Sequence, residues 1–254
     1  MGGRLEGRRA VVTGAGNGIG RAAALKLAAE GARVGCIDLD EAAAKATVAA
    51  ITDAAGSAVA LTADVTDEAQ VERAFTAAEE VFGGLDTVVA NAGILLAGQD
   101  DRADRLDVDV WRRVVDVNLT GIFLTCKHGI RALLRTGHGA VVCTASPTGL
   151  YGLAPGLDAY SSSKAGVYGL IRVLASDYAA DGIRVNGVIP GYTDTPMNDY
   201  VERPAGHERI IATIPLRRQG TATEVANVIA FLASDEASYV TGAVWAADGG
   251  MTAI

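Results

Sequence analysis

The stretch RAVVTGAGNGIG, residues 9–20, decides the fold of this chain. Its first half is rich in β-branched side chains, which is typical of a buried strand, and glycines follow at once. Ile19, Ala23 and Leu27 then recur at helical spacing until Gly31, where the pattern stops. A strand, a tight glycine turn and a helix in this order leave free backbone N–H groups at the helix start, and these favour a bound anion.

The glycine turn has the spacing G-x-x-x-G-x-G, formed by Gly14, Gly18 and Gly20. Glycines in such a turn let the backbone bend tightly, approach a pyrophosphate and bring the helix against the strand. The more familiar pattern G-x-G-x-x-G is not met, because Ile19 occupies its last position. The location of the turn between the first strand and the first helix still indicates a dinucleotide site.

Strands and helices alternate along the rest of the chain. Strands are expected at 9–13, 33–38, 58–63, 85–91, 140–145, 184–189 and 243–247, and helices from 19 and at 41–54, 67–82, 110–134, 160–178 and 224–233. This alternation predicts an α/β protein with a single Rossmann-type, doubly wound parallel sheet of about seven strands and helices on both faces. No linker-like segment divides the sequence, so one domain is expected over residues 1–254.

Residues 197–219 interrupt the regular alternation. They contain Pro204, Pro215 and scattered charges without a clean period, which predicts a mobile loop or a small helical lid over the substrate. Directly after them, Thr221 and Glu224 have the spacing of a capping box for the helix expected at 224–233.

Composition excludes several classes of function. Lys and Arg total 22 against 30 Asp and Glu, a net charge of −8, so no basic stripe is available for nucleic acid. The three cysteines, Cys36, Cys126 and Cys143, lack C-x-x-C spacing, which favours core packing in a reducing compartment and no zinc site. The three histidines are isolated, so no metal site is expected. We find neither a signal-peptide pattern nor an uninterrupted apolar span, and we expect a cytoplasmic protein that does not enter a membrane.

Asp38 ends the second predicted strand, where a carboxylate can accept hydrogen bonds from the ribose diol of an adenosine. The 2′-phosphate of NADP would meet this negative charge, and neither Asn17 nor Leu39 supplies a compensating cation. The sequence therefore favours NAD as the cofactor.

Tyr160 and Lys164 begin a predicted helix and are four residues apart, so both project from one face. A phenol has a pKa near 10 and is a poor acid or base at neutral pH, but a nearby ammonium lowers that pKa. Tyr160 could then exchange a proton with an alcohol or a carbonyl oxygen.

With these residues in place, the chain resembles the short-chain dehydrogenase/reductase family along almost its whole length. The matching motifs are TGAGNGIG at 13–20, Asp64 after the third strand, NAG at 91–93, Asn118, a serine before YSSSK, PGYTDTP at 190–196 and DGG at 248–250.

The resemblance implies a set of cofactor contacts. Around the adenosine and pyrophosphate these would be Gly14, Asn17, Gly18, Ile19, Gly20, Asp38, Asp64, Val65, Asn91 and Gly93. Around the nicotinamide and its ribose they would be Tyr160, Lys164, Pro190, Gly191, Thr193 and Thr195.

The resemblance also implies the catalytic roles. Ser146 would polarise the substrate oxygen, Tyr160 would exchange the proton, Lys164 would lower the pKa of Tyr160, and Asn118 would fix a water.

The serine departs from the family pattern. The position expected for it is Pro147, which has no hydroxyl, whereas the S-x-x-G pattern matches Ser146 through Gly149. One extra residue in the following loop reconciles the two, so Ser146 is the choice, with Thr144 and Thr148 as weaker alternatives.

We therefore expect an NAD-dependent enzyme that interconverts a secondary alcohol and a ketone by hydride transfer. The substrate-facing candidates are mainly apolar: Leu95, Pro147, Leu153, Tyr192, Met197 and Tyr200. One alternative is a 3-oxoacyl thioester reductase, which the tail at 215–242 resembles but Asp38 disfavours. Another is a non-catalytic NAD-binding sensor, although the Tyr, Lys and Asn that such a protein would lack are present.

The outer faces of helices 110–134 and 160–178 carry Ala, Leu and Val, and with the resemblance they predict a homotetramer.

Overall fold

The computed structural model describes residues 3–201 and 204–253, and within them seven parallel strands form one sheet in the order β3-β2-β1-β4-β5-β6-β9. The strands are β1 (Arg9–Thr13), β2 (Arg33–Asp38), β3 (Ser57–Thr62), β4 (Thr87–Ala90), β5 (Gly139–Thr144), β6 (Ile183–Pro190) and β9 (Val244–Ala247). The order reverses between β1 and β4. The predicted Rossmann-type sheet is confirmed.

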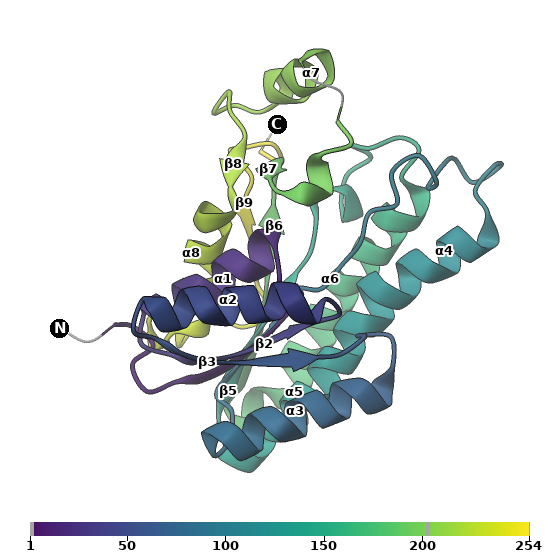
Figure 1. Ribbon diagram of the computed structural model, residues 1–254. Helices are drawn as coiled ribbons and strands as arrows, with labels where there is room; N and C mark the ends of the chain where they lie inside the picture. The colour runs from purple at the N-terminus through teal and green to yellow at the C-terminus, as the bar shows by residue number, and fades with distance from the viewer. Residues whose placement is uncertain (1–2, 202–203, 254) are drawn as a thin grey trace.

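Helices cover both faces of the sheet (Figure 1). One layer contains α1 (Gly18–Ala29), α2 (Glu41–Asp53) and α8 (Ala222–Ala233); the other contains α3 (Glu68–Phe82), α4 (Val108–Val115), α5 (Gly121–Thr136) and α6 (Asp158–Tyr178). Neighbouring strand residues point to opposite faces, so Val11 packs with α3, α5 and α6 while Val12 packs with α1 and α8. Burial from both sides explains the continuous apolar runs of these strands.

The predicted helix 110–134 differs from the observed one. It is α4 followed by a π-helical turn, Asp116–Thr120, and then α5. A π turn is a local widening of a helix that often occurs at functional sites, and the apolar period does not reveal it. The helix predicted from 160 begins at Asp158 instead. The capping box of Thr221 and Glu224 is present, and α8 begins at Ala222, two residues before the predicted start at 224.

The region expected as a loop or small helical lid contains α7 (Ala205–Thr213), which stands apart from the two layers at the top of Figure 1. The sequence did not predict the short strands β7 (Thr193–Asp194) and β8 (Gly220–Thr221), which pair with each other at the two ends of this region. Short 3₁₀ turns occupy Pro147–Gly149, Ala179–Asp181, Pro196–Asn198 and Asp235–Ala237.

The three cysteines are buried and free. Two that are distant in sequence come together: the Sγ atoms of Cys126 and Cys143 are 3.7 Å apart between α5 and β5. Burial raises the pKa of the Cys36 thiol to about 12. In the described residues we find no helix with the length and apolar character needed to cross a membrane.

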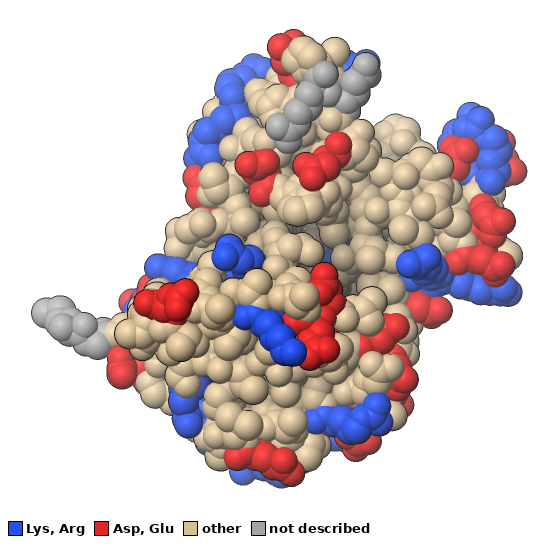
Figure 2. Space-filling view, in the orientation of Figure 1, with Lys and Arg blue, Asp and Glu red and all other residues tan. Residues whose placement is uncertain are grey.

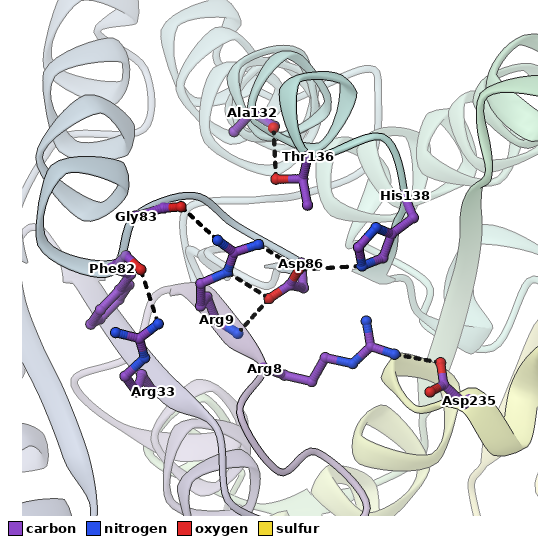
Figure 3. Close-up of polar contacts among 10 residues, drawn as sticks. All are labelled: Arg8, Arg9, Arg33, Phe82, Gly83, Asp86, Ala132, Thr136, His138 and Asp235. Carbon is purple, nitrogen blue, oxygen red and sulfur yellow. Dashed lines mark hydrogen bonds and ion pairs between the residues drawn. The ribbon is translucent and has the colours of Figure 1, made fainter.

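A charged cluster holds the amino ends of β1 and β4 together (Figure 3). The Asp86 carboxylate, 6% exposed, accepts hydrogen bonds from the backbone N–H of Arg9 at 2.9 Å and from its Nε and Nη2 at 2.8 Å. His138 Nε2 lies 3.4 Å from the same carboxylate. Burial raises the pKa of Asp86, but the hydrogen bonds from Arg9 outweigh that effect and leave the pKa below its ordinary value of 3.8.

We predict that Asp86→Ala lowers the free energy of unfolding by about 3 kcal/mol, because it leaves the Arg9 guanidinium without its buried partner. The contribution of Asp86 is complete above its ordinary pKa and is lost as the pH falls through the lower folded value. The difference from the wild type, measured by urea unfolding, should therefore shrink in acid. Asp235→Ala, which removes the exposed partner of Arg8, is the control and should cost less than about 1 kcal/mol. Equal costs for the two variants would contradict this prediction.

Candidate active site

A cavity of about 1510 Å³ lies at the carboxyl ends of the strands, where the order reverses between β1 and β4. Figure 2 shows the molecule hollowed at this level below α7, with acidic side chains on the lower edge of the hollow. In open parallel sheets such a crevice is the usual place for a ligand.

Asn91, directly after β4, joins the ends of three strands. Its Nδ2 donates to the carbonyl oxygens of Thr13 at 3.2 Å and Gly14 at 3.4 Å, and its Oδ1 accepts from Thr144 Oγ1 at 3.0 Å. Its backbone N–H donates to Thr13 Oγ1 at 3.1 Å. The glycine turn, the β4 end and the β5 end are therefore fixed relative to one another.

The glycine turn is shaped for close approach. Gly14 has a φ of +66°, and a Cβ there would lie 2.9 Å from Ala92 Cα; a Cβ on Gly20 would lie 1.9 Å from the Gly14 carbonyl oxygen. The Asn17 side chain makes no capping hydrogen bond to α1, and the first turn of α1 contains no acidic residue within the described chain. The free N–H groups at this helix start fit a pyrophosphate.

Asp38 is held rigidly at the cavity wall. Its Oδ2 accepts from Gly16 N–H at 2.7 Å and its Oδ1 from Asp40 N–H at 3.0 Å. Asp64 also lines the cavity, but its Oδ1 is engaged in a local turn with the backbone N–H and hydroxyl of Thr66. Both carboxylates therefore line the cavity with their positions fixed by local hydrogen bonds.

Nearly all the predicted cofactor contacts share this cavity. The lining includes Gly14, Asn17, Gly18, Ile19, Asp38, Asp64, Val65, Asn91, Gly93, Tyr160, Lys164, Pro190, Gly191, Thr193 and Thr195. Gly20 lies behind the lining, packed against Gly14. The fit of these residues to a dinucleotide rests on the open helix start and the fixed Asp38 carboxylate.

Side chains on one face of α6 donate hydrogen bonds to the backbone at the end of β5. Lys164 Nζ donates to the Thr144 carbonyl oxygen at 2.9 Å, and Tyr168 Oη donates to the Ser146 carbonyl oxygen at 2.7 Å. Tyr160 lies one turn before Lys164 and meets the Ser146 side chain. Tyr168 was not predicted from the sequence, although it lies four residues after Lys164 on the same helix face.

Tyr160 and Ser146 form the chemical centre of the cavity. Burial raises the pKa of the Tyr160 phenol, and a hydrogen bond with Ser146 opposes part of that rise. The Ser146 Oγ is also 3.0 Å from Thr148 Oγ1. A neutral phenol and a hydroxyl side by side can bind one substrate oxygen between them.

Lys164 is 3% exposed, and burial lowers its pKa to about 8. Its Nζ lies 6.0 Å from the centroid of the Tyr160 ring. No direct hydrogen bond joins the two groups among the described contacts. With the ammonium at this distance, the pKa of the Tyr160 phenol is still raised, chiefly by burial.

Asn118 lies in the π-helical turn and is fully buried. Its Oδ1 accepts from Ile94 N–H at 2.7 Å, and its Nδ2 donates to the Ile94 carbonyl at 2.9 Å and to Ser163 Oγ at 3.2 Å. The side chain therefore clamps the loop after β4 onto α6. The water that the resemblance assigns to Asn118 would meet a side chain whose amide is already engaged with protein.

The surroundings of Ser146, Thr144 and Thr148 differ, and these three hydroxyls were the candidates for polarising the substrate oxygen. Thr144 Oγ1 is engaged with Asn91, and Pro147 is buried in the 3₁₀ turn that follows Ser146. Ser146 contacts Tyr160, whereas Thr148 contacts Ser146. This arrangement favours Ser146 and leaves Thr148 as its neighbour.

Asp100 is a site residue that the sequence did not indicate. Its carboxylate, 6% exposed, accepts from Ala159 N–H at 3.0 Å and from Tyr160 N–H at 2.9 Å. It caps α6 from a loop about 60 positions away in sequence, because the N-cap residue Leu157 makes no side-chain hydrogen bond to the helix. In the opposite direction, the Asp158 carboxylate of α6 accepts a hydrogen bond from the Ala103 N–H of this loop at 2.8 Å.

The six predicted substrate-facing residues all line the cavity, together with residues of α7 that were not predicted. His207, expected to be isolated, lies with its Nδ1 3.2 Å from Tyr192 Oη and its ring centroid 5.6 Å from that of Tyr192. The other two histidines contact carboxylates, His128 that of Glu68 and His138 that of Asp86. Among residues 3–201 and 204–253, no cluster of three metal-ligating side chains is found.

The comparisons with known proteins agree over the whole chain. A family model described as enoyl-(acyl carrier protein) reductase matches residues 14–252. A cis-4-hydroxycyclohexanecarboxylate dehydrogenase of Sinomonas cyclohexanicum is 46% identical over 100% of both chains. The crystal structure of levodione reductase is 38% identical and covers 98% of this chain and 99% of its own, with a TM-score of 0.93. This chain belongs to the short-chain dehydrogenase/reductase family.

The family predicted from the motifs is thereby confirmed. As a short-chain dehydrogenase/reductase, the chain is an oxidoreductase that acts on CH–OH groups with a nicotinamide cofactor. A 3-oxoacyl-(acyl-carrier-protein) reductase of Thermotoga maritima is also similar, at 38% identity over 98% of this chain and 99% of its own.

We predict that Asp100→Ala in this dehydrogenase lowers kcat about tenfold and the free energy of unfolding by about 1–2 kcal/mol, because α6 loses its cap and Tyr160 its fixed backbone. Asp100→Asn keeps an acceptor oxygen and should recover part of both losses. The exposed neighbour Asp101→Ala is the control, measured for kcat, thermal unfolding and NADH affinity. If Asp100→Ala weakened NADH binding by the same factor as it lowered kcat, this would contradict the prediction that Asp100 acts only by positioning Tyr160.

Proposed function

We propose that residues 1–254 form a single NAD-binding and catalytic domain that interconverts a secondary alcohol, preferably on an apolar ring, with its ketone. The observation that carries this proposal is the contact between Tyr160 and Ser146 in a cavity whose substrate side is apolar. The name of the 46% identical relative states a hydroxyl on a cyclohexane ring, which supports a ring alcohol as the substrate of this chain. We further propose a cytoplasmic location, which the three unpaired, buried thiols favour.

In this proposal Ser146 and Tyr160 hold the substrate oxygen from two sides. Tyr160 takes the hydroxyl proton when the alcohol is oxidised and returns it to the ketone in the reverse direction. NAD, when bound, supplies the hydride acceptor at the C4 position of its nicotinamide. Lys164, buried one helical turn away, favours the phenolate that Tyr160 forms during the proton transfer. Asn118 fixes the loop that carries Gly93 and Ile94 along the opposite wall.

The preference for NAD rests on Asp38. Its carboxylate is fixed by two backbone N–H groups, so it cannot swing away from a 2′-phosphate without losing them. A like charge placed against it costs several kcal/mol.

We predict that kcat/KM favours NAD over NADP by roughly 100-fold in the wild type. Asp38→Ala should narrow this ratio, whereas Glu41→Gln, a charge change on the exposed start of α2, should leave it unchanged. Steady-state kinetics with both cofactors give the ratio. Equal use of NAD and NADP by the wild type would overturn the assignment.

Two rival functions are weaker. A reductase of 3-oxoacyl thioesters is favoured by the Thermotoga maritima relative, but Asp38 opposes NADPH, the usual reductant of biosynthesis. A non-catalytic NAD sensor would have no need of the Tyr160, Ser146 and Lys164 arrangement. A panel of ring alcohols and hydroxyacyl thioesters, followed by NADH absorbance, separates the three functions.

We also propose a homotetramer with D2 symmetry. The outer faces of α5 and α6 expose Phe123 at 44% and Val173 at 51%, and β9 exposes Trp245 at 41%. Association through these faces would bury apolar side chains that otherwise meet water. Light scattering at micromolar concentration should give four times the mass of one chain, and the mass of a single chain would contradict the proposal.

We predict that Ser146→Ala lowers kcat by about 10²–10³ with NADH affinity little changed, because the donor to the developing oxyanion is lost. Thr148→Val and Thr144→Val should each cost much less. The three variants are compared by kcat and by NADH titration. A damaging Thr148→Val beside a mild Ser146→Ala would mean that Thr148 polarises the substrate.

A further inference from the structure

Arg209 lies on α7 and lines the cavity. Its side chain forms no ion pair or hydrogen bond with any residue that the structure describes, in contrast to Arg218, whose Nη2 lies 2.6 Å from Glu224 Oε1. An unpaired guanidinium presents its full set of donors to whatever enters the space in front of it.

Among the lining residues that the structure describes on the α7 wall, Arg209 has no charged neighbour. The described lining residues from position 192 onward are Tyr192, Thr193, Thr195, Met197, Asn198, Tyr200, Arg209, Ile210, Thr213 and Met251, and among these only Arg209 carries a charge. The acidic lining residues Asp38, Asp40 and Asp64 follow β2 and β3, at the end of the cavity assigned to adenosine. The remaining charged lining residues, Asp109, Arg112, Arg113 and Asp116, lie on α4 and the π-helical turn that follows it. Among the described lining residues from position 192 onward, a negative group on a substrate therefore meets one cation and no carboxylate.

The position of Arg209 is set by contacts on both sides of it in α7. His207, two residues before it, is held against Tyr192, and Ile210, directly after it, packs on the small apolar cluster of Tyr192, Val201 and Ile214. Thr213, one turn later on the same face, also lines the cavity. The helix thus presents Arg209 to the cavity from an anchored backbone.

We infer that Arg209 is a specificity residue that binds an anionic group, a carboxylate in the first instance, on the alcohol substrate. This inference rests on the proposed function and narrows its substrate class from ring alcohols to hydroxy acids. The guanidinium fork matches the two oxygens of a carboxylate, and such charge-assisted pairs are stronger than neutral hydrogen bonds. The apolar walls between Arg209 and Tyr160 would hold the ring, with the hydroxyl at Tyr160 and Ser146.

The test measures binding without turnover. Cyclohexanecarboxylate and its neutral counterpart cyclohexanecarboxamide are titrated calorimetrically into the enzyme saturated with NADH. Arg209→Gln should weaken carboxylate binding by about 10- to 100-fold and leave carboxamide binding unchanged. Arg209→Lys should fall between wild type and Arg209→Gln. Arg73→Gln, on the exposed face of α3 outside the cavity, is the matched control and should change neither affinity.

Turnover gives the second readout. In Arg209→Gln, kcat/KM should fall for 4-hydroxycyclohexanecarboxylate and stay at the wild-type value for cyclohexanol. Equal losses for both alcohols, or no loss for either, would overturn the inference. A loss of NADH affinity in Arg209→Gln would place the guanidinium on the cofactor and also overturn it.

Failure of the proposed function gives a different result. In that case the wild type oxidises neither alcohol with NAD. If the wild type oxidises cyclohexanol but binds carboxylate no more tightly than carboxamide, the proposed function stands and only the role of Arg209 is lost.

Discussion

The hydrogen bonds of the Asn91 side chain are the constraint on which the site depends. One amide joins the glycine turn after β1, the end of β4 and Thr144 at the end of β5. Thr144 in turn accepts from Lys164 through its carbonyl, so the cofactor wall and the catalytic helix share a single frame. Parallel strands bring their carboxyl ends to one edge, but only such cross-links fix the distances among side chains that come from five separate segments.

The chemistry follows from where charge is placed in this frame. Tyr160 is a half-buried neutral phenol next to Ser146, and Lys164 is buried as an ammonium whose pKa has fallen to about 8. Burial strengthens any electrostatic effect of one on the other, because the medium around them screens weakly. The carboxylate of Asp100 is not among the lining residues of the cavity and holds the start of α6 through the backbone N–H groups of Ala159 and Tyr160.

Local patterns predicted much of this from the sequence. The glycine turn, the carboxylate at the end of β2 and the Tyr160 and Lys164 pair each depend on short spacings that one strand or one helix enforces. Asp100 could not be predicted, because its partners lie about 60 positions away and only the folded loop brings them together. The packing of α7 sets the contact of His207 with Tyr192 and the position of Arg209. This packing could not be predicted, because apolar residues at 197–219 have no regular helical spacing. The register at Ser146 was ambiguous for a different reason, because Pro147 occupies the position expected for the serine. In the structure the hydroxyls of Ser146 and Thr148 lie only 3.0 Å apart.

The central claim is that Tyr160 carries the proton in a site that is otherwise complete. The most direct measurement compares Tyr160→Phe with the wild type in two assays, the dissociation constant of NADH and kcat for a secondary alcohol. The substitution removes only the hydroxyl, so we expect NADH affinity within about twofold of the wild type and kcat lower by about 10²–10⁴. Turnover near the wild-type value in Tyr160→Phe, with NADH bound normally, would contradict the account.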